Sequence, residues 1–428
     1  MPCYREMTPA QLKEELSSLQ SAFAAKKALG LSLDMSRGKP SPEQLDLSMG
    51  MLDVISSGDS LITDSGIDVR NYGQLEGIPE ARELFADMMG VQPDEVFICG
   101  NSSLNMMYDT VSRGMVFGFP GGDKPWGKQE KLKFLCPAPG YDRHFAICEV
   151  FGIQMITIPM TPDGPDMNLV ESWVNNDDTV KGIWCVPQYS NPEGITYSDE
   201  TVRRFANLKP AAGDFRIFWD NAYCVHHLND HPDHLLNLMD ECKKVGSEDM
   251  VIMFSSTSKI SFSGAGVAAI GCSRTNMEAL EKVIAMQIIS FDKINQLRHV
   301  RFFKNLDGIK AHMEKHKALL APRFEIVLST LQRELNGLDV ARWTNPNGGY
   351  FVSVDTMDGC AARTVALCKE AGVKLTNAGA TFPYGKDPHD RNIRIAPSYP
   401  SLEELQKATD IFCLCVRLAA VEKLLEQA

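Results

Sequence analysis

The sequence lacks several features that mark other classes of protein. No apolar run approaches the roughly 20 residues of a membrane-spanning helix, although 44% of the 428 residues are hydrophobic. Basic residues are not in surplus, because 43 lysines and arginines stand against 55 aspartates and glutamates, for a net charge of -12. Such a charge repels nucleic acids and anionic membranes at long range. We therefore expect a small-molecule partner, no nucleic acid and no membrane.

The twelve cysteines have no CxxC pair and no regular spacing. Disulfide frameworks and structural zinc sites both depend on such spacing, so free thiols in a reducing cytoplasm are expected. The opening segment MTPAQLKEEL also lacks the pattern of a secretory signal. Thr8 as N-cap, Pro9 at the first helical position and Gln11 completing a capping box predict a folded helix instead.

Short apolar runs alternate with helical patterns between residues 95 and 271. The runs are EVFICG, LKFLCP, QMITIP, KGIWCV, FRIFWD, MVIMF and GVAAIG. Runs of this length, separated by helices, are typical of parallel strands that are buried on both faces. The sequence therefore predicts an α/β fold with a seven-stranded, mostly parallel sheet.

A chain of 428 residues exceeds what one hydrophobic core usually supports, so two domains are expected. The strand region predicts a large domain over residues 53–305. Residues 275–317 show one long helical pattern with few breakers, which leads into a smaller α+β domain. Residues 1–52 and 306–428 are predicted to form that smaller domain together.

Polar residues follow several predicted strands at the point where each strand ends. Residues 100–103 follow the first run, residues 191–194 the fourth, Asp220 and Tyr223 the fifth, and Lys259 the sixth. Ligands of parallel sheets bind at the carboxyl ends of the strands. These residues are therefore expected to share one site.

Ser102 and Ser103 stand where a strand turns into a predicted helix. Free backbone N–H groups, two hydroxyls and the positive end of the helix dipole can together hold a phosphate. Ordinary N-capping explains the same two residues and stays an alternative.

Asp220 and Lys259 are suited to a cofactor with a ring nitrogen and an aldehyde. A carboxylate at the end of FRIFWD is costly to bury unless a cation or strong donor meets it, and a protonated ring nitrogen would serve. A desolvated Lys259 would supply the neutral amine that condenses with an aldehyde. A turn-capping aspartate and a surface lysine are the alternatives. Together with a phosphate site and the pair Asn191 and Tyr223, which suits a phenolic oxygen, these parts match pyridoxal phosphate.

In this order, the segments resemble the fold type I pyridoxal-phosphate enzymes, specifically the class I aminotransferases, over nearly the whole chain. The matching segments are NYGQLEGIPEARELFA, GNSSLNMM, APGYDRHF, YSNPEGI, WDNAY, STSKISFSGAG, NPNGGYFV and RNIRIAPSY. The segment LDMSRGKPSPEQLDLS is similar to a subgroup of aspartate aminotransferases and to the catalytic portion of MocR-like proteins. The resemblance implies pyridoxal 5'-phosphate as cofactor and a homodimer with shared active sites.

The resemblance also implies individual roles. Lys259 would hold the cofactor and move the proton, and Asp220 would keep the ring nitrogen protonated. Asn191 and Tyr223 would bond the phenolic oxygen. The other cofactor contacts are assigned to Ser102, Ser103 and Ser256 at the phosphate, to Tyr141 stacked on the ring, and to Tyr72 from a second subunit.

For the substrate, Arg394 stands at the position that binds the α-carboxylate in a bidentate pair, and Gly38 lets the backbone approach. Arg37 or Lys293 is expected to recognise a second carboxylate, within the chain or from across the dimer, with a solvated surface position as the alternative for each. One position departs from the family: Val267 replaces the usual phosphate-binding arginine. A lysine or arginine from elsewhere, or more backbone N–H groups, is expected in its place.

Histidines gather in HHLNDHPDH, residues 226–234. His227 and His231 have the spacing of helical metal ligands, but Asn229 and Pro232 predict a loop. We therefore predict a solvated loop and no metal site here.

The predicted function is amino-group transfer between an L-amino acid, foremost aspartate or glutamate, and a 2-oxo acid such as 2-oxoglutarate. An amino acid lyase or aspartate β-decarboxylase with the same cofactor stays an alternative, because a fold does not decide which bond is broken. A non-catalytic effector-binding domain like that of MocR regulators is the third hypothesis. It is less favoured because residues 1–50 are too few for a DNA-binding module with its linker.

Overall fold

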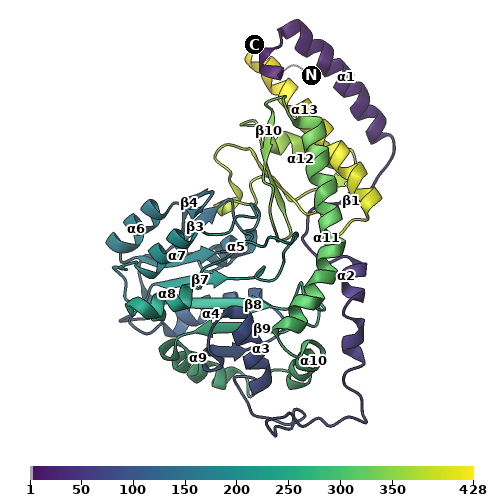
Figure 1. Ribbon diagram of the computed structural model, residues 1–428. Helices are drawn as coiled ribbons and strands as arrows, with labels where there is room; N and C mark the ends of the chain where they lie inside the picture. The colour runs from purple at the N-terminus through teal and green to yellow at the C-terminus, as the bar shows by residue number, and fades with distance from the viewer. Residues whose placement is uncertain (1–2) are drawn as a thin grey trace.

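All seven predicted strands lie in one sheet of the computed structural model, which describes residues 3–428 (Figure 1). The strands of this sheet, in chain order, are β2 (Val96–Ile98), β3 (Lys133–Ala138), β4 (Gln154–Thr161), β5 (Gly164–Pro165), β6 (Val180–Cys185), β7 (Arg216–Asp220), β8 (Val251–Ser256) and β9 (Ala268–Cys272). Their order across the sheet is β2-β9-β8-β7-β6-β3-β4-β5. The run from β8 to β4 is parallel, whereas β9 pairs antiparallel with both of its neighbours. The predicted α/β class is confirmed, and the two-residue β5 adds an eighth strand.

The sheet is buried on both faces, as the continuous apolar runs predict. Along β7, Ile217 and Trp219 pack into one hydrophobic cluster and Phe218 into another, because successive side chains of a strand point to opposite faces. The first face is covered by α3 (Pro79–Met89), α6 (Met167–Asn176), α7 (Asp199–Ala206), α8 (Leu238–Val245) and α10 (Lys293–Phe303). The second face is covered by α4 (Ser103–Phe117), α5 (Asp142–Val150) and α9 (Arg274–Gln287). We call these two clusters the sheet core.

A second core lies at the other end of the molecule. It is built from α1 (Pro9–Lys27), α12 (Ala361–Glu370), α13 (Leu402–Gln427), the antiparallel strands β10 (Ala341–Trp343), β11 (Val352–Thr356) and β13 (Asn392–Ile395), and the parallel pair β1 (Leu33–Asp34) and β12 (Val373–Lys374). The predicted capping box of Thr8 and Gln11 is present at the start of α1. Figure 1 shows α1 beside α13, with both chain ends at this end.

The helix α11 (Leu306–Leu335) joins the two cores (Figure 1). Ile309 and Met313 pack into the sheet core, and Phe324 and Val327 into the second core. Pro322 lies inside the helix and has no backbone N–H, so one hydrogen bond of the helix is missing between these two stretches. The division into residues 53–305 and residues 1–52 with 306–428 stays a prediction, and α11 contributes to both cores.

The helical pattern over residues 275–317 is confirmed, and the structure divides it into three helices: α9, α10 and α11. Asp292 and Asn305 each cap a new helix start by accepting a backbone N–H. Lys304 ends α10 with a positive φ of 66°. The apolar spacing continues across both breaks, so the pattern alone hid the caps.

The remaining short elements are the helix α2 (Pro42–Asp46) and 3-10 turns at Tyr4–Glu6, Met49–Leu52, Pro93–Glu95, Trp126–Lys128, Glu248–Met250 and Pro383–Gly385. Among residues 3–428, every helix is too short or too polar to cross a membrane.

Candidate active site

A pocket of about 550 Å³ opens at the carboxyl ends of the parallel strands, between the sheet and the second core. Every predicted site residue except Tyr72 and Lys293 lines it. The lining residues among them are Arg37, Gly38, Ser102, Ser103, Tyr141, Asn191, Asp220, Tyr223, Ser256, Lys259 and Arg394. The pocket therefore brings together residues that lie as much as 357 positions apart in the chain, from Arg37 to Arg394.

Lys259 lies in the loop that comes after β8 and reaches into the pocket. Burial lowers the pKa of its amine, Asp220 opposes that shift, and Arg394 adds to it. The amine stands 5.0 Å from the centre of the Tyr223 ring and 5.8 Å from that of Tyr350. Burial holds the pKa of Tyr223 well above its usual value, so its hydroxyl keeps its hydrogen. The site thus combines a lysine shifted toward its neutral form with a neutral phenol.

Asp220 ends β7 as predicted, and its two oxygens have different surroundings. Oδ2 lies 3.2 Å from Nε2 of His144, whereas Oδ1 is buried without a hydrogen-bond partner among the described residues. A buried carboxylate oxygen without a donor is costly. A protonated ring nitrogen would supply the missing hydrogen, so this residue fits pyridoxal phosphate.

His144 is a site residue that the sequence reasoning missed. It lies on α5, three positions after Tyr141, and its ring stacks on Trp184 with a centroid distance of 4.4 Å and an angle of 10°. Tyr141 meets the edge of the same ring at 4.9 Å, and burial raises the pKa of Tyr141 to about 12. The signal is present in APGYDRHF, because positions i and i+3 lie on the same side of a helix start.

The predicted phosphate end consists of hydroxyls and a helix start. Ser102 caps α4 without a side-chain hydrogen bond of its own, so its hydroxyl is available. Ser256 donates to Ser258 at 3.1 Å, and Ser258 donates to the carbonyl of Asn101 at 3.2 Å. Val267 is buried in the sheet core. The arginine expected by resemblance is thus replaced by an apolar residue, while Ser258 adds a hydroxyl to the pocket wall.

Arg394 extends from β13 of the second core into the pocket. Its Nη1 donates to Asp142 Oδ1 at 3.0 Å and to Asn191 Oδ1 at 3.1 Å, and its Nη2 donates to Thr376 Oγ1 at 3.3 Å. Its Nε is buried without a partner among the described residues. The guanidinium also lies 4.8 Å from the centre of the Phe351 ring. This geometry holds the guanidinium in place and leaves two of its five N–H donors, on Nε and on Nη2, for a ligand.

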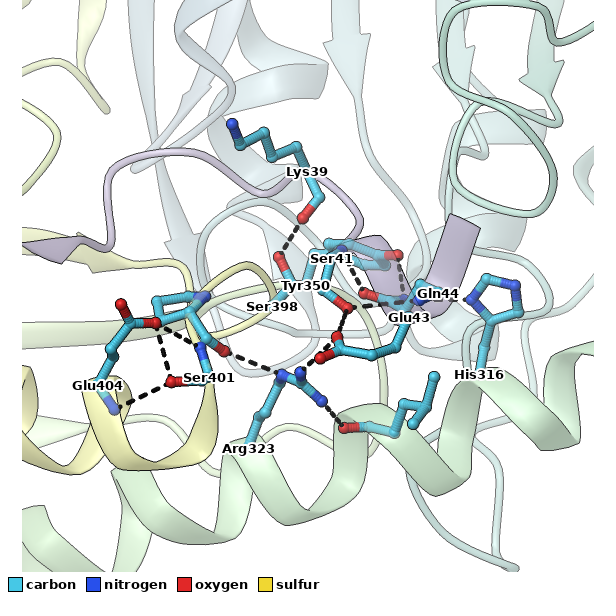
Figure 2. A network of polar contacts seen from close by, with 12 residues as sticks. Lys39, Ser41, Glu43, Gln44, His316, Arg323, Tyr350, Ser398, Ser401 and Glu404 are labelled. Atoms are coloured by element: carbon cyan, nitrogen blue, oxygen red, sulfur yellow. Dashed lines mark hydrogen bonds and ion pairs between the residues drawn. The ribbon is translucent and has the colours of Figure 1, made fainter. Parts of the chain in front are cut away.

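Glycine is required at position 38 because the Phe351 ring packs against its backbone. A Cβ at this position would lie 2.5 Å from Cζ of the Phe351 ring, which is closer than such atoms approach. The pocket wall around Gly38 continues into a polar network in Figure 2. There Ser398 donates to the carbonyl of Lys39 at 2.9 Å, and Arg323 donates to Glu43 at 3.1 Å. The network fixes the N-terminal segment against α11.

Two predicted substrate or cofactor residues do not line the pocket. Tyr72 is 80% exposed, and its assigned contact from a second subunit stays a prediction. Lys293 is buried, and its Nζ donates to the carbonyls of Asn71 at 2.5 Å and Gly73 at 2.7 Å. The solvated surface position offered as the alternative for Lys293 is wrong, because the residue is buried and its amine holds the loop that carries Tyr72. That Lys293 recognises a substrate carboxylate, within the chain or from across the dimer, stays a prediction.

The histidine-rich segment over residues 226–234 is a loop with specific contacts. His227 Nδ1 lies 2.8 Å from the hydroxyl of Tyr189, and Asp233 accepts from Thr196 at 2.8 Å and from Asn347 at 2.8 Å. Within residues 3–428, no group of three or more histidine, cysteine, aspartate or glutamate side chains is arranged to hold a metal ion.

This sheet, with a lysine loop at its carboxyl edge and a second core above the pocket, defines the class of fold type I pyridoxal-phosphate enzymes. Solved structures agree with it. The structure of an aspartate transaminase from Corynebacterium glutamicum matches with a TM-score of 0.96 and 42% identity over 98% of this chain and 99% of that chain. An α-aminoadipate aminotransferase from Thermus thermophilus, complexed with a phosphopyridoxyl-leucine compound, shares the fold with a TM-score of 0.73 at 20% identity, over 92% of this chain and 93% of that one.

Sequence comparisons point to the same group. Residues 7–428 match the family model described as aspartate amino-transferase. An aspartate aminotransferase of C. glutamicum is 44% identical over 404 residues, which cover 94% of this chain and 93% of the relative. A protein of Mycolicibacterium smegmatis that is named as an aminotransferase is 47% identical over 407 residues, which cover 95% of each chain. The chain belongs to the aspartate aminotransferase family, and it is a class I aminotransferase that uses pyridoxal phosphate.

Proposed function

We propose that the enzyme exchanges amino groups between dicarboxylic substrates, aspartate or glutamate on one side and a 2-oxo acid such as 2-oxoglutarate on the other. The charge of the pocket carries this proposal. Its basic residues are Arg37, Lys39, Arg143, Lys259, Lys374 and Arg394, against only Asp142 and Asp220. A basic pocket in a chain of net charge -12 favours a substrate with more than one carboxylate. The relative named aspartate aminotransferase supports the same substrates.

Each predicted residue receives a role within this proposal. Pyridoxal phosphate supplies the aldehyde and the electron-withdrawing ring. Lys259 then binds the cofactor and moves a proton at the substrate Cα, and its lowered pKa favours the neutral amine that this requires. Asp220 keeps the ring nitrogen protonated through its unpaired Oδ1. Tyr223, Asn191, Tyr141, Ser102, Ser103 and Ser256 orient the cofactor.

Arg394 binds the α-carboxylate, and its buried Nε is a free donor for it. Arg37 and Arg143 are both exposed at the pocket wall and are our candidates for the second carboxylate. An exposed guanidinium there stays solvated until a carboxylate arrives and can then form a bidentate pair. Because Gly38 has no side chain, its backbone packs directly against the Phe351 ring in the pocket wall.

We further propose a homodimer in which Tyr72 of each subunit completes the partner's phosphate site. Apolar side chains support it: Tyr72 is 80% exposed, Met286 85% and Ile289 59%. Exposed apolar groups of this size are typical of subunit interfaces. Lys293 fixes the loop of Tyr72 through Asn71 and Gly73, so the phenol is presented on an ordered loop. A cytoplasmic location is also proposed, because all of the described cysteines are free thiols.

The proposal is tested by incubating the purified protein with aspartate and pyridoxal phosphate, with and without 2-oxoglutarate. Glutamate and an equal amount of oxaloacetate are expected over many turnovers when 2-oxoglutarate is present, whereas without it no glutamate and at most about one oxaloacetate per active site should form. Alanine and carbon dioxide from aspartate alone would identify a β-decarboxylase instead. Lys259→Ala is expected to remove turnover and the visible absorbance band of the bound cofactor. Arg143→Gln and Arg37→Gln should raise the KM for aspartate but leave the KM for alanine unchanged.

A further inference from the structure

The loop that carries Lys259, residues 257–267, is fastened to α10 by side chains that do not line the pocket. This loop joins β8 to β9. Asn295 Nδ2 donates to the carbonyls of Ala265 at 3.1 Å and Gly266 at 2.9 Å. One turn later on the same helix, His299 faces the other end of the loop. Positions i and i+4 share one face of a helix, so both side chains act on the loop together.

His299 meets two hydroxyls that flank Lys259. Its Nε2 lies 3.0 Å from Thr257 Oγ1 and 2.9 Å from Ser261 Oγ, two positions before and two positions after the lysine. Thr257 Oγ1 in turn accepts the backbone N–H of Val267 at 2.9 Å. The ring therefore contacts the residues on both sides of Lys259, and Thr257 connects it to Val267 at the end of the loop.

The chemistry of the ring is fixed by its surroundings. His299 Nδ1 lies 2.8 Å from the carbonyl of Asn295, and a carbonyl only accepts, so Nδ1 carries the hydrogen. Burial lowers the pKa of the ring to about 4, Arg298 adds to the shift and Asp292 opposes it. The ring is therefore neutral near pH 7, and Nε2 presents one lone pair that can accept from the hydroxyl of Thr257, to which Ser261 donates at 3.0 Å. The hydroxyl of Ser261 can also donate to the carbonyl of Thr257 at 3.2 Å. The hydroxyl of Thr257, which is buried and already accepts the N–H of Val267, has the ring as the acceptor for its own hydrogen, so losing the ring leaves this buried donor without its partner.

We propose that His299, with Asn295, is a positioning residue that holds the Lys259 loop in its reactive shape independently of the phosphate. This inference rests on the role of Lys259 in the proposed function. It gives a physical account of Val267. Where the family's arginine would tie the loop to the phosphate, this chain buries an apolar side chain and ties the loop to α10. The loop is consequently organised before the cofactor arrives.

The proposal is tested with His299→Phe, which keeps the ring shape and removes the acceptor, and His299→Gln, which places an amide oxygen near Nε2. His299→Phe is expected to lower kcat by on the order of 10-fold to 100-fold, as small misplacements of a catalytic group do, and to change the KM for the amino acid by less than about threefold. His299→Gln should recover most of the rate. His389→Phe, at a histidine with a 56% exposed side chain, is the matched control and should behave as the wild type.

A second readout does not depend on activity. In the cofactor-free full chain, hydrogen exchange at the amides of Thr257, Ser261 and Val267 should be slow in the wild type and faster by roughly 10-fold in His299→Phe. If His299→Phe fails to fold, Thr257→Val with Ser261→Ala removes both hydroxyls that meet the ring. Because Thr257 Oγ1 also accepts the N–H of Val267, exchange in this variant is compared only at Thr257 and Ser261, where it is expected to give the same pattern. Wild-type kcat and wild-type exchange in either variant, even with a lowered unfolding temperature, would overturn the proposal. A wild-type protein without transaminase activity would instead overturn the proposed function and leave the exchange result to be judged alone.

Discussion

Arg394 Nη1 lies 3.0 Å from Asp142 Oδ1, so the guanidinium proposed to bind the substrate already holds a carboxylate of its own chain. The side chain of Arg394 is only 7% exposed, whereas that of Asp142 is 32% exposed. The arginine is thus fixed, and Asp142 is the partner that can turn toward solvent. An incoming α-carboxylate that binds through Nε and Nη2 must compete with the negative charge of Asp142 at Nη1.

Replacing Asp142 with asparagine should therefore strengthen substrate binding. The variant keeps the shape of the side chain and removes its charge, and a partly exposed ion pair is worth about 0.2–1 kcal/mol, or roughly a 1.5-fold to 5-fold decrease in KM. The decrease in KM is measured by steady-state kinetics with aspartate. Asp240→Asn, at an exposed position on α8, serves as the control. An unchanged or higher KM for Asp142→Asn would show that Asp142 does not compete.

His144 is expected to act through Asp220. His144→Phe removes the donor that lies 3.2 Å from Asp220 Oδ2 and keeps the stacking on Trp184. The buried carboxylate then lacks a partner, at a cost of about 1–3 kcal/mol, and cofactor binding and kcat should both weaken. Fluorescence titration with pyridoxal phosphate measures the first effect. His144→Gln restores a donor and should recover part of the loss, and equal behaviour of both variants would contradict this role.

Gly38→Ala should disturb the pocket through Phe351. The new Cβ would lie 2.5 Å from Phe351 Cζ and 2.8 Å from Cε1, so the ring must shift away from position 38, which disturbs its packing on the Arg394 guanidinium 4.8 Å from its centre. We expect a KM for the amino acid raised by on the order of 10-fold, because the arginine loses its packing. Gly58→Ala, where the new Cβ would lie 3.8 Å from Ser56 Oγ, is the control. A variant with wild-type KM would show that Phe351 shifts without effect.

Stability should fall as the solution becomes acidic, through His299 and His316. Burial lowers the pKa of each ring from 6.5 to about 4. Between these values the unfolded chain binds protons that the folded chain does not, so stability is full above about pH 6.5 and decreases toward pH 4. Each ring lowers the free energy of unfolding by about 3 kcal/mol as the pH falls over that range. Unfolding in urea at several pH values measures the slope, which should be smaller in His299→Gln. A flat profile would contradict the buried neutral rings.

The strand ends could be predicted from the sequence because buried parallel strands have a simple signature, and the residues after each strand lie on one edge of the sheet. Asp220, Tyr223 and Lys259 can be located in this way. The partner of Asp220 was not found, because His144 comes from a helix on another strand connection: the spacing in APGYDRHF places His144 beside Tyr141, but it does not show which strand end the ring reaches. The burial of Lys293 was missed for a similar reason: a residue pattern does not show that the backbone carbonyls of Asn71 and Gly73 accept from its amine.

The three helices over residues 274–335 show a different limit. Apolar spacing reports which face of a helix is buried, and this face stays continuous when a new helix begins at Asp292 or Asn305. The caps are single side-chain contacts, so they are weak signals beside the long periodic pattern. The brace of Asn295 and His299 on the lysine loop likewise appears only when α10 is placed against residues 257–267.

Pro322 makes α11 easiest to bend at the place where the helix passes from one core to the other. A helix that lacks one backbone hydrogen bond bends most easily at that position, and the turns on either side are held by packed side chains. Any movement of the second core relative to the sheet core should therefore bend α11 near this proline. In such a movement Arg394 travels with the second core, and Lys259 stays with the sheet core.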